Sequence, residues 1–173
     1  MAISVMAVCT GNMCRSPLAE RLLAARAAEA GLDVVVDSAG TRAVNGVEIH
    51  RETRRVLEGY GGSGDGFASR LISPRLLRGR DLVLTATRAH RDAVQEMAPL
   101  LWKKTYTILE AAHLGDSDAA LTLAGLARAR LGLDTDDPAW DVEDPIGREP
   151  EVFDRTGAQI SDAIDSIVRL LAR

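Results

Sequence analysis

Residues 9–17 form a polar loop between an apolar segment and a helix-forming segment, and this arrangement constrains the fold more than any other feature of the sequence. The segment Ile3–Val8 is apolar and rich in β-branched residues, so it predicts a short buried strand. Pro17 suits the first turn of a helix, where a missing backbone N–H costs nothing. A helix is therefore expected from Pro17 to Ala30, with Gly31 as its C-cap.

The loop combines a thiol with a guanidinium. Its residues are, in order, Cys9-Thr10-Gly11-Asn12-Met13-Cys14-Arg15-Ser16-Pro17. Backbone N–H groups in such a loop point inward, and the positive end of the helix dipole adds to them, so the loop is predicted to bind a phosphate dianion without a metal. Arg15 is expected to hold two phosphate oxygens in a bidentate fork. The same positive field favours the thiolate form of Cys9, which makes Cys9 a nucleophile at neutral pH.

A plain strand-to-helix turn with a buried structural cysteine is the alternative, but it leaves Gly11, the Arg15-Ser16 pair and Pro17 unexplained. The segment resembles the signature loop of the low-molecular-weight protein tyrosine phosphatases, Cys-x-Gly-Asn-x-Cys-Arg-Ser-Pro, and every fixed position is present. The resemblance covers nearly the whole chain in the family's order. It continues in Leu18-Ala19-Glu20, Asp37-Ser38-Ala39-Gly40-Thr41, Asp81-Leu82-Val83-Leu84-Thr85 and Asp144-Pro145.

The resemblance implies one α/β domain over residues 1–173, built on a four-stranded parallel sheet of order 2-1-3-4 with helices on both faces. Short β-branched runs that alternate with helical patterns agree with this. Further strands are expected at Val34–Val36, Leu82–Leu84 and Thr105–Ile108, and helices at Glu48–Leu57, Pro74–Leu77, from Thr87 to near Pro99, and at the C-terminus.

The connection over residues 115–140 is longer than the family usually has. Ala119–Leu131 is expected to be an added helix there, and we favour extra packing over a lid as its role.

The resemblance also implies a mechanism without a cofactor or metal. Cys9 attacks the phosphorus in line, Arg15 and the loop amides hold the other phosphate oxygens, and an acid protonates the leaving group. The predicted phosphate-binding residues are Thr10, Gly11, Asn12, Met13, Cys14, Arg15 and Ser16.

Asp144 is the candidate for the acid. Pro145 restricts it to extended geometry, which suits a carboxylate held out on a loop above the pocket. A rival pair is Asp137-Pro138, but Asp144 stands just before the terminal helix, as the resemblance requires. Asp137 belongs to an acidic run and is interpreted as part of a plain turn.

Other loop residues have supporting roles. Ser16 is expected to donate a hydrogen bond to the Cys9 sulfur, and Asn12 tolerates the left-handed backbone that an anion-binding loop demands. In the family, that asparagine is tied to a serine after the second strand, which Ser38 matches, and to a histidine. The histidine has no counterpart, because the equivalent stretch reads Phe67-Ala68-Ser69-Arg70. The loop is therefore expected to be braced differently here.

Cys14 has two interpretations. In the family its counterpart is a partner thiol that forms a reversible disulfide with the nucleophile and shields it from over-oxidation. The alternative is a small apolar filler beneath the loop, since four intervening residues permit a disulfide but do not impose one.

Composition narrows the class of protein and the compartment in which it is expected to work. A chain of 173 residues that is 46% hydrophobic suits one compact domain, and the net charge of −4 argues against nucleic-acid binding. Apolar runs are too short for a membrane span, and no signal peptide is apparent. Having only two cysteines, both in the loop, fits a reducing compartment, so a cytoplasmic protein is expected. His50, His90 and His113 lack metal-ligand spacing and are interpreted as surface or capping residues.

Substrate choice is the most open question. Relatives that take phosphotyrosine normally flank the pocket with aromatic side chains, but the corresponding positions here are Ala43-Val44-Asn45 and Ile146-Gly147. Trp140 is a possible replacement, although a lone tryptophan near such a loop is more often packed against the body. A related branch that prefers phosphoarginine has threonine where this chain has Met13, and Met13 favours an apolar contact with the leaving group.

The function expected from all this is a phosphate-monoester hydrolase of the protein-tyrosine-phosphatase type, acting through a phosphocysteine. The alternatives are a phosphatase for phosphoarginine or a phosphorylated small molecule, and a non-catalytic phosphate-binding module. Arsenate reduction is discounted, because its thioredoxin-coupled form needs further cysteines downstream, and the chain has none.

Overall fold

A parallel sheet lies at the centre of the computed structural model, which describes residues 2–173. Its four strands have the order β2-β1-β3-β4, as expected. β1 (Ile3–Cys9) lies in the interior of the sheet, between β2 (Val34–Gly40) and β3 (Leu82–Thr85). β4 (Thr105–Thr107) pairs with β3. Because parallel strands end at the same edge, Cys9 at the end of β1 lies at the carboxyl edge of the sheet, where open α/β sheets bind ligands.

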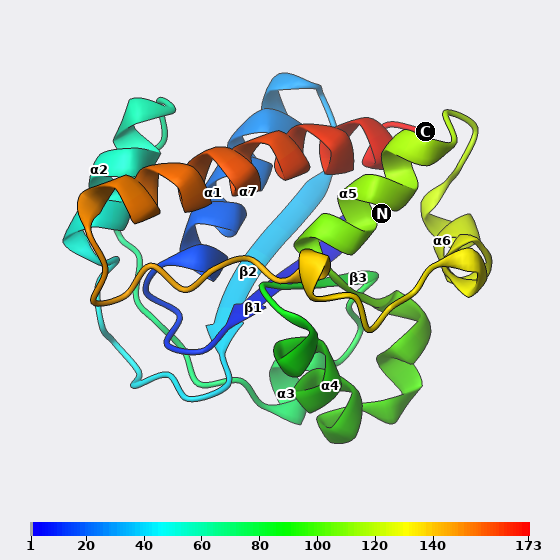
Figure 1. Ribbon diagram of the computed structural model, residues 1–173, viewed down its shortest axis with the longest axis horizontal. Helices are drawn as coiled ribbons and strands as arrows, with labels where there is room; N and C mark the ends of the chain where they lie inside the picture. Colours follow the sequence, from blue (N-terminus) through cyan, green and yellow to red (C-terminus); the bar gives the residue numbers. More distant parts are fainter. Residues whose placement is uncertain (1) are drawn as a thin grey trace.

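Helices cover both faces of the sheet (Figure 1). α1 (Arg15–Glu29), α5 (Ile108–Ser117) and α7 (Pro150–Leu171) pack on one face. α3 (Pro74–Leu77) and α4 (Arg88–Met97) pack on the other. The side chains of β1 alternate between the two cores, with Val5 and Ala7 facing the first and Met6 and Val8 the second. The predicted strand is thus buried on both sides.

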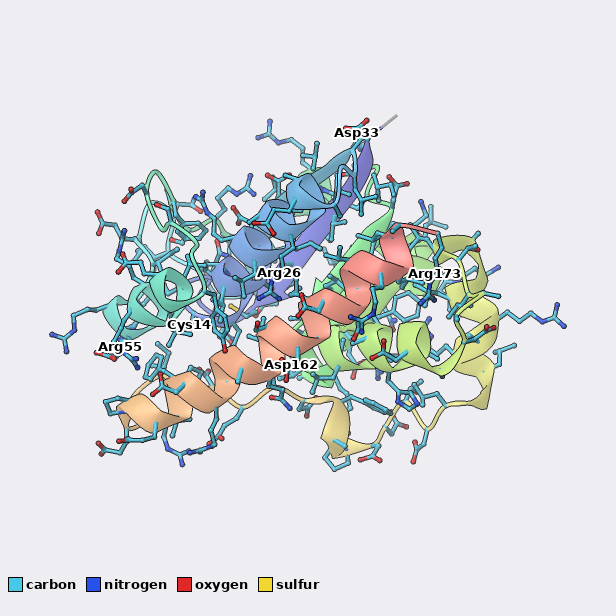
Figure 2. The ribbon with its side chains drawn as sticks, turned by 90° about the horizontal axis from the view of Figure 1, so that it is seen from above. Cys14, Arg26, Asp33, Arg55, Asp162 and Arg173 are labelled. Atoms are coloured by element: carbon cyan, nitrogen blue, oxygen red, sulfur yellow. The ribbon has the colours of Figure 1, made fainter. Side chains whose placement is uncertain are left out.

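α7 crosses over α1 and α5, as the view in Figure 2 shows. Arg26 of α1 donates hydrogen bonds to the Ser161 carbonyl (2.6 Å) and hydroxyl (2.7 Å) and pairs with Asp165. At the far end, Arg173 donates to the Gly115 carbonyl at 3.0 Å. These contacts fix the helix that follows the Asp144 loop. Within residues 2–173, no helix is long and apolar enough to cross a membrane.

Several element boundaries differ from those expected. α2 runs from Arg51 to Gly59 rather than from Glu48 to Leu57, because His50 is its N-cap and accepts a hydrogen bond from the Glu52 amide. The predicted fourth strand ends at Thr107, where α5 begins. That helix was missed, although Thr107 and Glu110 form a reciprocal capping box at its start.

The 115–140 connection does not contain the single helix expected over Ala119–Leu131. It has three short consecutive pieces instead, a 3-10 turn at Leu123–Gly125, α6 (Leu126–Ala129), and a 3-10 turn at Arg130–Gly132. A further 3-10 turn spans Pro138–Trp140. Gly125 and Gly132 fall within this stretch, and glycine lowers the stability of a continuous helix.

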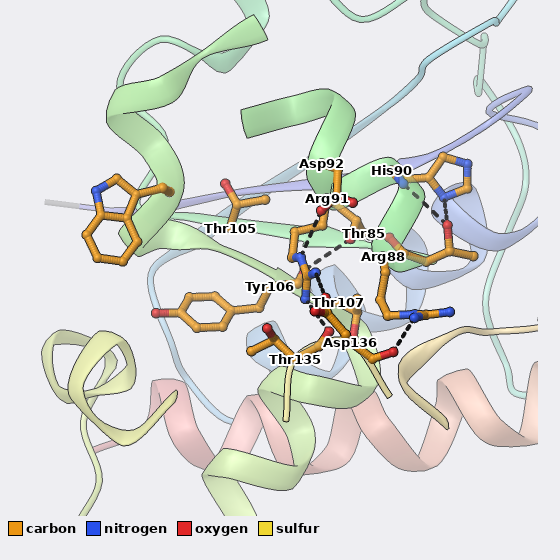
Figure 3. Close-up of polar contacts among 12 residues, drawn as sticks. Thr85, Arg88, His90, Arg91, Asp92, Thr105, Tyr106, Thr107, Thr135 and Asp136 are labelled. Carbon is orange, nitrogen blue, oxygen red and sulfur yellow. Dashed lines mark hydrogen bonds and ion pairs between the residues drawn. The ribbon is translucent and has the colours of Figure 1, made fainter. Parts of the chain in front are cut away.

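Arg130 anchors this connection to the body. Its guanidinium donates to the carbonyls of Thr105 and Trp102, both at 2.6 Å, and lies 4.3 Å from the centre of the Tyr106 ring. Nearer the Asp144 loop, Arg91 of α4 donates to the Thr135 carbonyl at 2.9 Å (Figure 3). The connection is therefore packed against α4 and β4.

Candidate active site

A pocket of about 230 Å³ opens at the carboxyl edge of the sheet and joins the predicted loop to the predicted acid. Its lining residues are Cys9, Thr10, Gly11, Met13, Cys14, Arg15, Asp144 and Ile146. Asn12 and Ser16 belong to the same loop, but both are buried and neither lines the pocket. A larger hollow of about 400 Å³ lies beside Tyr106, Lys103 and Lys104, but it contains no thiol. The smaller pocket, which contains the thiol and the guanidinium, is therefore the candidate active site.

The loop presents hydrogen-bond donors that the protein itself does not use. Within residues 2–173, no carbonyl or side chain accepts a hydrogen bond from the backbone amides of residues 10–14. The Nε of Arg15, a residue that is only 4% exposed, is buried and also lacks a partner in that part of the chain. α1 starts at Arg15, so the positive end of its dipole adds to these donors. Such an arrangement suits a multiply charged anion.

Asn12 holds the loop in shape, as the sequence predicts. Its φ of 53° is the one left-handed backbone conformation at a non-glycine residue within residues 2–173. Its side-chain amide donates to the hydroxyls of Ser16 (2.9 Å) and Ser38 (2.8 Å) and accepts from the backbone amide of Arg70 (2.8 Å). All the hydrogen-bonding groups of the buried Asn12 side chain are thereby engaged.

The bracing expected in place of the absent histidine comes from two residues. Glu20 accepts a hydrogen bond from the Ser38 hydroxyl, and Arg70 contributes its backbone amide to Asn12 and its guanidinium to the Ser38 carbonyl (3.0 Å). Burial raises the pKa of Glu20, partly offset by the bond from Ser38. No role was predicted for Glu20 from the sequence, although Glu20 lies within the Leu18-Ala19-Glu20 segment of the family resemblance.

Gly40, at the end of β2, allows the close approach of the loop. A Cβ at this position would lie 2.4 Å from the Thr10 carbonyl oxygen and 2.8 Å from the Asn12 amide nitrogen. Both distances are far below normal contact, and both involve backbone atoms that a rotamer change cannot move. Only glycine fits here without displacing the loop.

Cys9 is 2% exposed, and its sulfur lies 3.0 Å from the Ser16 hydroxyl oxygen. The predicted contact between the two is present. When the sulfur is a thiolate, Ser16 must be the donor, because a thiolate has no proton to give.

Cys14 is a free, buried thiol. Burial raises its pKa to about 12, against a smaller lowering by a hydrogen bond from Thr53. Cys14 is therefore protonated at neutral pH. Its pairing with Cys9 stays a prediction.

Asp144 meets Arg15 at the mouth of the pocket, where Nη2 of Arg15 lies 2.7 Å from a carboxylate oxygen. The Asp144 side chain is 49% exposed. Asp137 lies outside the pocket, and its carboxylate accepts a hydrogen bond from the Ala139 amide at the start of a 3-10 turn. This agrees with its interpretation as a turn residue. Geometry thus distinguishes the two Asp-Pro pairs.

Arg88 and Asp141, to which the sequence analysis gave no role, hold the segment before Asp144 in place. The backbone amide and guanidinium of Arg88, the first residue of α4, both donate to the Asp141 carboxylate, at 2.7 Å and 2.9 Å. Burial opposes ionisation of Asp141, but the bonds from Arg88 outweigh it and keep the pKa of the carboxyl below its ordinary value. Next to it, the Val142 amide donates to the Ala86 carbonyl, and the Val142 carbonyl accepts from Arg15 at 3.0 Å.

His90 was interpreted as a surface or capping residue, and this is wrong. It is 8% exposed, and its ring bridges Thr10 of the phosphate-binding loop and Thr87, the N-cap of α4. Burial, followed by the positive charge of Arg15, lowers the pKa of His90 to about 4. Its imidazole is therefore neutral at physiological pH. His50, by contrast, does cap a helix.

Within the described residues 2–173, no aromatic side chain lines the pocket, as expected from the sequence. Ile146 and Met13 line it instead, and Ile146 is 47% exposed. Trp140 lies outside the lining, because its ring packs 5.2 Å from His113 and its indole N–H donates to the Asp134 carbonyl. Trp140 does not replace the missing aromatic wall in this conformation.

Comparison with known proteins gives a consistent result for the N-terminal two thirds of the chain. The model of the family described as low molecular weight phosphotyrosine protein phosphatase matches residues 4–118. The low molecular weight protein-tyrosine-phosphatase PtpA of Staphylococcus epidermidis is 33% identical over 118 residues, which are 67% of this chain and 75% of that protein. Wzb of Escherichia coli K12, another such phosphatase, is 40% identical over 96 residues, 56% of this chain and 63% of its own length.

Solved structures extend the likeness to nearly the whole chain. A low molecular weight protein tyrosine phosphatase from T. tengcongensis is 30% identical, with a TM-score of 0.77, and the match covers 96% of this chain and 98% of that one. The YwlE arginine phosphatase from Geobacillus stearothermophilus is 26% identical, with a TM-score of 0.73, over 96% of this chain and 90% of that one.

Proposed function

We propose that this chain, which belongs to the low molecular weight phosphotyrosine protein phosphatase family, hydrolyses phosphate monoesters with Cys9 as the nucleophile. The Cys9 sulfur attacks phosphorus, the bond from phosphorus to the leaving oxygen breaks, and Asp144 gives its proton to that oxygen. Asp144 then accepts a proton from water as the water attacks the phosphocysteine. The sulfur–phosphorus bond breaks, inorganic phosphate leaves, and Ser16 stabilises the departing thiolate through its hydrogen bond.

One observation carries this proposal. The donors of residues 10–14 and the buried Nε of Arg15 have no partners in residues 2–173, and all of these residues except Asn12 line the same pocket as Cys9. Preorganised donors of this kind stabilise the charge that builds up on the phosphoryl oxygens in the transition state. Asp144, which pairs with Arg15 at the mouth, is the one carboxylate that lines the pocket within residues 2–173.

Substitution of the nucleophile tests the proposal. Cys9→Ser should abolish hydrolysis of an aryl phosphate, because a serine hydroxyl does not ionise at neutral pH, while calorimetry should still detect phosphate binding. Rapid quenching of the wild-type enzyme with substrate should trap a phosphate adduct on Cys9. Residual activity above about one per cent would contradict the assignment of the nucleophile. Phosphate binding without any turnover by the wild-type protein would favour a non-catalytic binding module.

The substrate class that we propose first is a phosphotyrosyl protein, since the relatives found by sequence carry that activity in their names. A non-tyrosyl substrate is the second candidate, because Ile146 and Met13 occupy the pocket mouth where an aromatic wall would stack on a phenyl ring. The kcat/KM values for phosphotyrosine, phosphoserine and phosphoarginine peptides and for sugar phosphates decide between them. A preference for any substrate other than phosphotyrosine would overturn the first choice.

We also propose Cys14 as the redox partner of Cys9, in the reducing environment of the cytoplasm. Peroxide oxidises the Cys9 thiolate to a sulfenic acid, and the Cys14 thiol attacks that sulfur to form a disulfide and release water. Because Cys14 is largely protonated, the second step should be slow at neutral pH. Peroxide inactivation should be reversed by a thiol reductant in the wild-type enzyme but largely permanent in Cys14→Ser. Equal recovery in both would leave Cys14 as a filler.

A further inference from the structure

His90 lies at the start of α4 (Figure 3). Its ring stands between the hydroxyls of Thr10, in the phosphate-binding loop, and Thr87. Its Nε2 is 2.8 Å from the Thr10 hydroxyl oxygen, and its Nδ1 is 2.8 Å from that of Thr87. The mechanism proposed above uses neither the His90 ring nor the Thr10 hydroxyl. Thr10 follows the nucleophile directly and lines the pocket.

The direction of these two hydrogen bonds depends on which ring nitrogen carries the proton. A neutral imidazole has one N–H and one unprotonated nitrogen, so His90 donates to one threonine and accepts from the other. The Thr87 oxygen also accepts a hydrogen bond from the backbone amide of His90, at 3.3 Å. The Thr87 proton itself has no other acceptor in the described part of the chain than Nδ1 of His90.

Full use of the donors therefore selects one tautomer. If Nδ1 carried the proton, the Thr87 hydroxyl would accept twice, and its own proton would have no partner within residues 2–173. If Thr87 donates to Nδ1, the proton is on Nε2, and Nε2–H donates to the Thr10 oxygen. Thr87 is only partly buried, but its hydroxyl faces the buried His90 ring, and Nδ1 is the one acceptor within hydrogen-bond distance in residues 2–173. The second arrangement, which gives every donor a partner, is therefore favoured.

We propose that the Thr10 hydroxyl donates a hydrogen bond to an oxygen of the bound phosphoryl group, and that His90 is the positioning residue that keeps this hydroxyl free to donate. Because Thr10 accepts from Nε2–H, its own proton is available to the pocket. With the other tautomer, Thr10 would donate to His90 and have no proton left for an anion. The inference rests on the proposed phosphatase function and adds a side-chain donor to the backbone amides of the loop.

Binding of inorganic phosphate tests the role of Thr10 apart from catalysis. Thr10→Val preserves shape but removes the hydroxyl, and it should weaken phosphate binding by about ten- to hundredfold, the range for hydrogen bonds to charged groups. Thr10→Ser should restore most of the affinity, because serine keeps the donor. Calorimetry measures the Kd values, and far-UV circular dichroism shows that each variant is folded. Phosphate affinity within about twofold of wild type in Thr10→Val would overturn the proposal.

The tautomer of His90 gives an independent test in the unmodified protein. Nitrogen NMR of histidine-labelled enzyme at neutral pH should show His90 with a protonated Nε2 and an unprotonated Nδ1. A proton on Nδ1 would overturn the positioning role. His90→Gln keeps an N–H near the Nε2 position and should affect phosphate affinity less than His90→Leu. His113→Gln, a histidine change outside the pocket, is the matched control and should bind phosphate like wild type.

A double variant separates positioning from general damage to the loop. If His90 acts through Thr10, His90→Leu should weaken phosphate binding in the wild type but cause little further loss in the Thr10→Val background. Independent, additive losses would overturn the proposal. These measurements need no turnover, so they remain informative even if Cys9→Ser were to contradict the proposed function.

Discussion

The phosphate-binding loop and the acid-bearing loop meet at one pocket but are held in opposite ways. In the phosphate-binding loop, Asn12 and Ser16 are completely buried and Arg15 is nearly so, and Asn12 ties the loop to β2 and to Arg70. In the acid-bearing loop, residues 143–149 are exposed except for Pro145. This loop is fixed mainly at its start, where Asp141 and Val142 bind Arg88 and Ala86.

The difference reflects what each loop has to recognise. The transferred phosphoryl group is the same in every substrate, so its donors can be fixed in advance, and preorganised donors cost no reorganisation during the reaction. Leaving groups differ between substrates. The Asp144 carboxylate is exposed and its loop is held mainly at its start, so we expect it to reach leaving-group oxygens in different positions. We therefore expect the buried loop to determine whether the enzyme hydrolyses phosphate monoesters at all. The exposed loop should determine which substrates it hydrolyses fast.

The largest effect that should separate the two loops is the loss of the acid. Asp144→Asn should slow hydrolysis of poor leaving groups by roughly 10²–10⁴-fold, the usual contribution of a general acid, but activated aryl phosphates far less. The measurement is kcat/KM across aryl phosphates of graded leaving-group pKa. Asp137→Asn, in the neighbouring Asp-Pro pair, is the control and should change little. Reversed effects would mean that the wrong Asp-Pro pair has been chosen.

A change beneath the buried loop should affect all substrates alike. Gly40→Ala forces a methyl group against the Thr10 and Asn12 backbone, and a displacement of about 1 Å in a catalytic loop can cost roughly hundredfold in rate. We expect a loss in kcat/KM of that order, independent of the leaving group. Gly59→Ala, at a glycine with open space and no positive φ, should retain full activity. A leaving-group-dependent loss in Gly40→Ala would contradict the division between the loops.

Release of the acid-bearing loop should give a weaker version of the Asp144 phenotype. Arg88→Gln removes the guanidinium from Asp141 but leaves the catalytic carboxylate in place. We expect poor leaving groups to react on the order of tenfold more slowly, with activated substrates almost unaffected. The control is Arg148→Gln, which breaks an exposed ion pair to Glu143 within the same loop. Equal losses on good and poor leaving groups would assign Arg88 a general structural role.

The smallest effect concerns substrate choice at the mouth of the pocket. Ile146→Tyr supplies the missing ring, and aromatic stacking of about 0.5–1.5 kcal/mol should raise kcat/KM for a phosphotyrosine peptide by up to about tenfold. Ile146→Leu and a phosphoserine peptide serve as controls, and neither should show a gain. If the tyrosine brings no gain, the leaving group does not contact position 146.

The same contrast explains what the sequence could predict. The phosphate-binding loop is contiguous, so residues 3–17 suffice to predict the strand before it, the start of the helix after it and Cys9 as the candidate nucleophile. The predicted strand order is confirmed. Asn12 and Ser38 were also predicted, through the resemblance to a known family, and their hydrogen bond is present.

Contacts between distant segments were not predictable in this way. The Arg88–Asp141 and Thr10–His90 contacts join residues 53 and 80 positions apart, and arginines, aspartates and histidines at such separations carry no local signal. The prediction of a single helix over Ala119–Leu131 was wrong for a different reason. Composition favoured a helix, but Arg130 and the buried Leu126 hold the segment to the body, and Gly125 lies within the expected helical run. Tertiary contacts outweighed local propensity there.

The interior position of β1 links the chemistry of Cys9 to the folding of the whole chain. β1 pairs with β3, and the Ser4 amide bonds to Asp81, 77 residues later, while Arg15 and Asp144 are separated by 129 residues. Parallel pairings between such distant segments form slowly, because loop closure precedes the contacts that reward it. In a nascent chain Cys9 therefore lies apart from Asp144 and from the strand beside it. The complete pocket forms only when folding is almost complete, so enzymatic activity should report on the native state more stringently than helix content does.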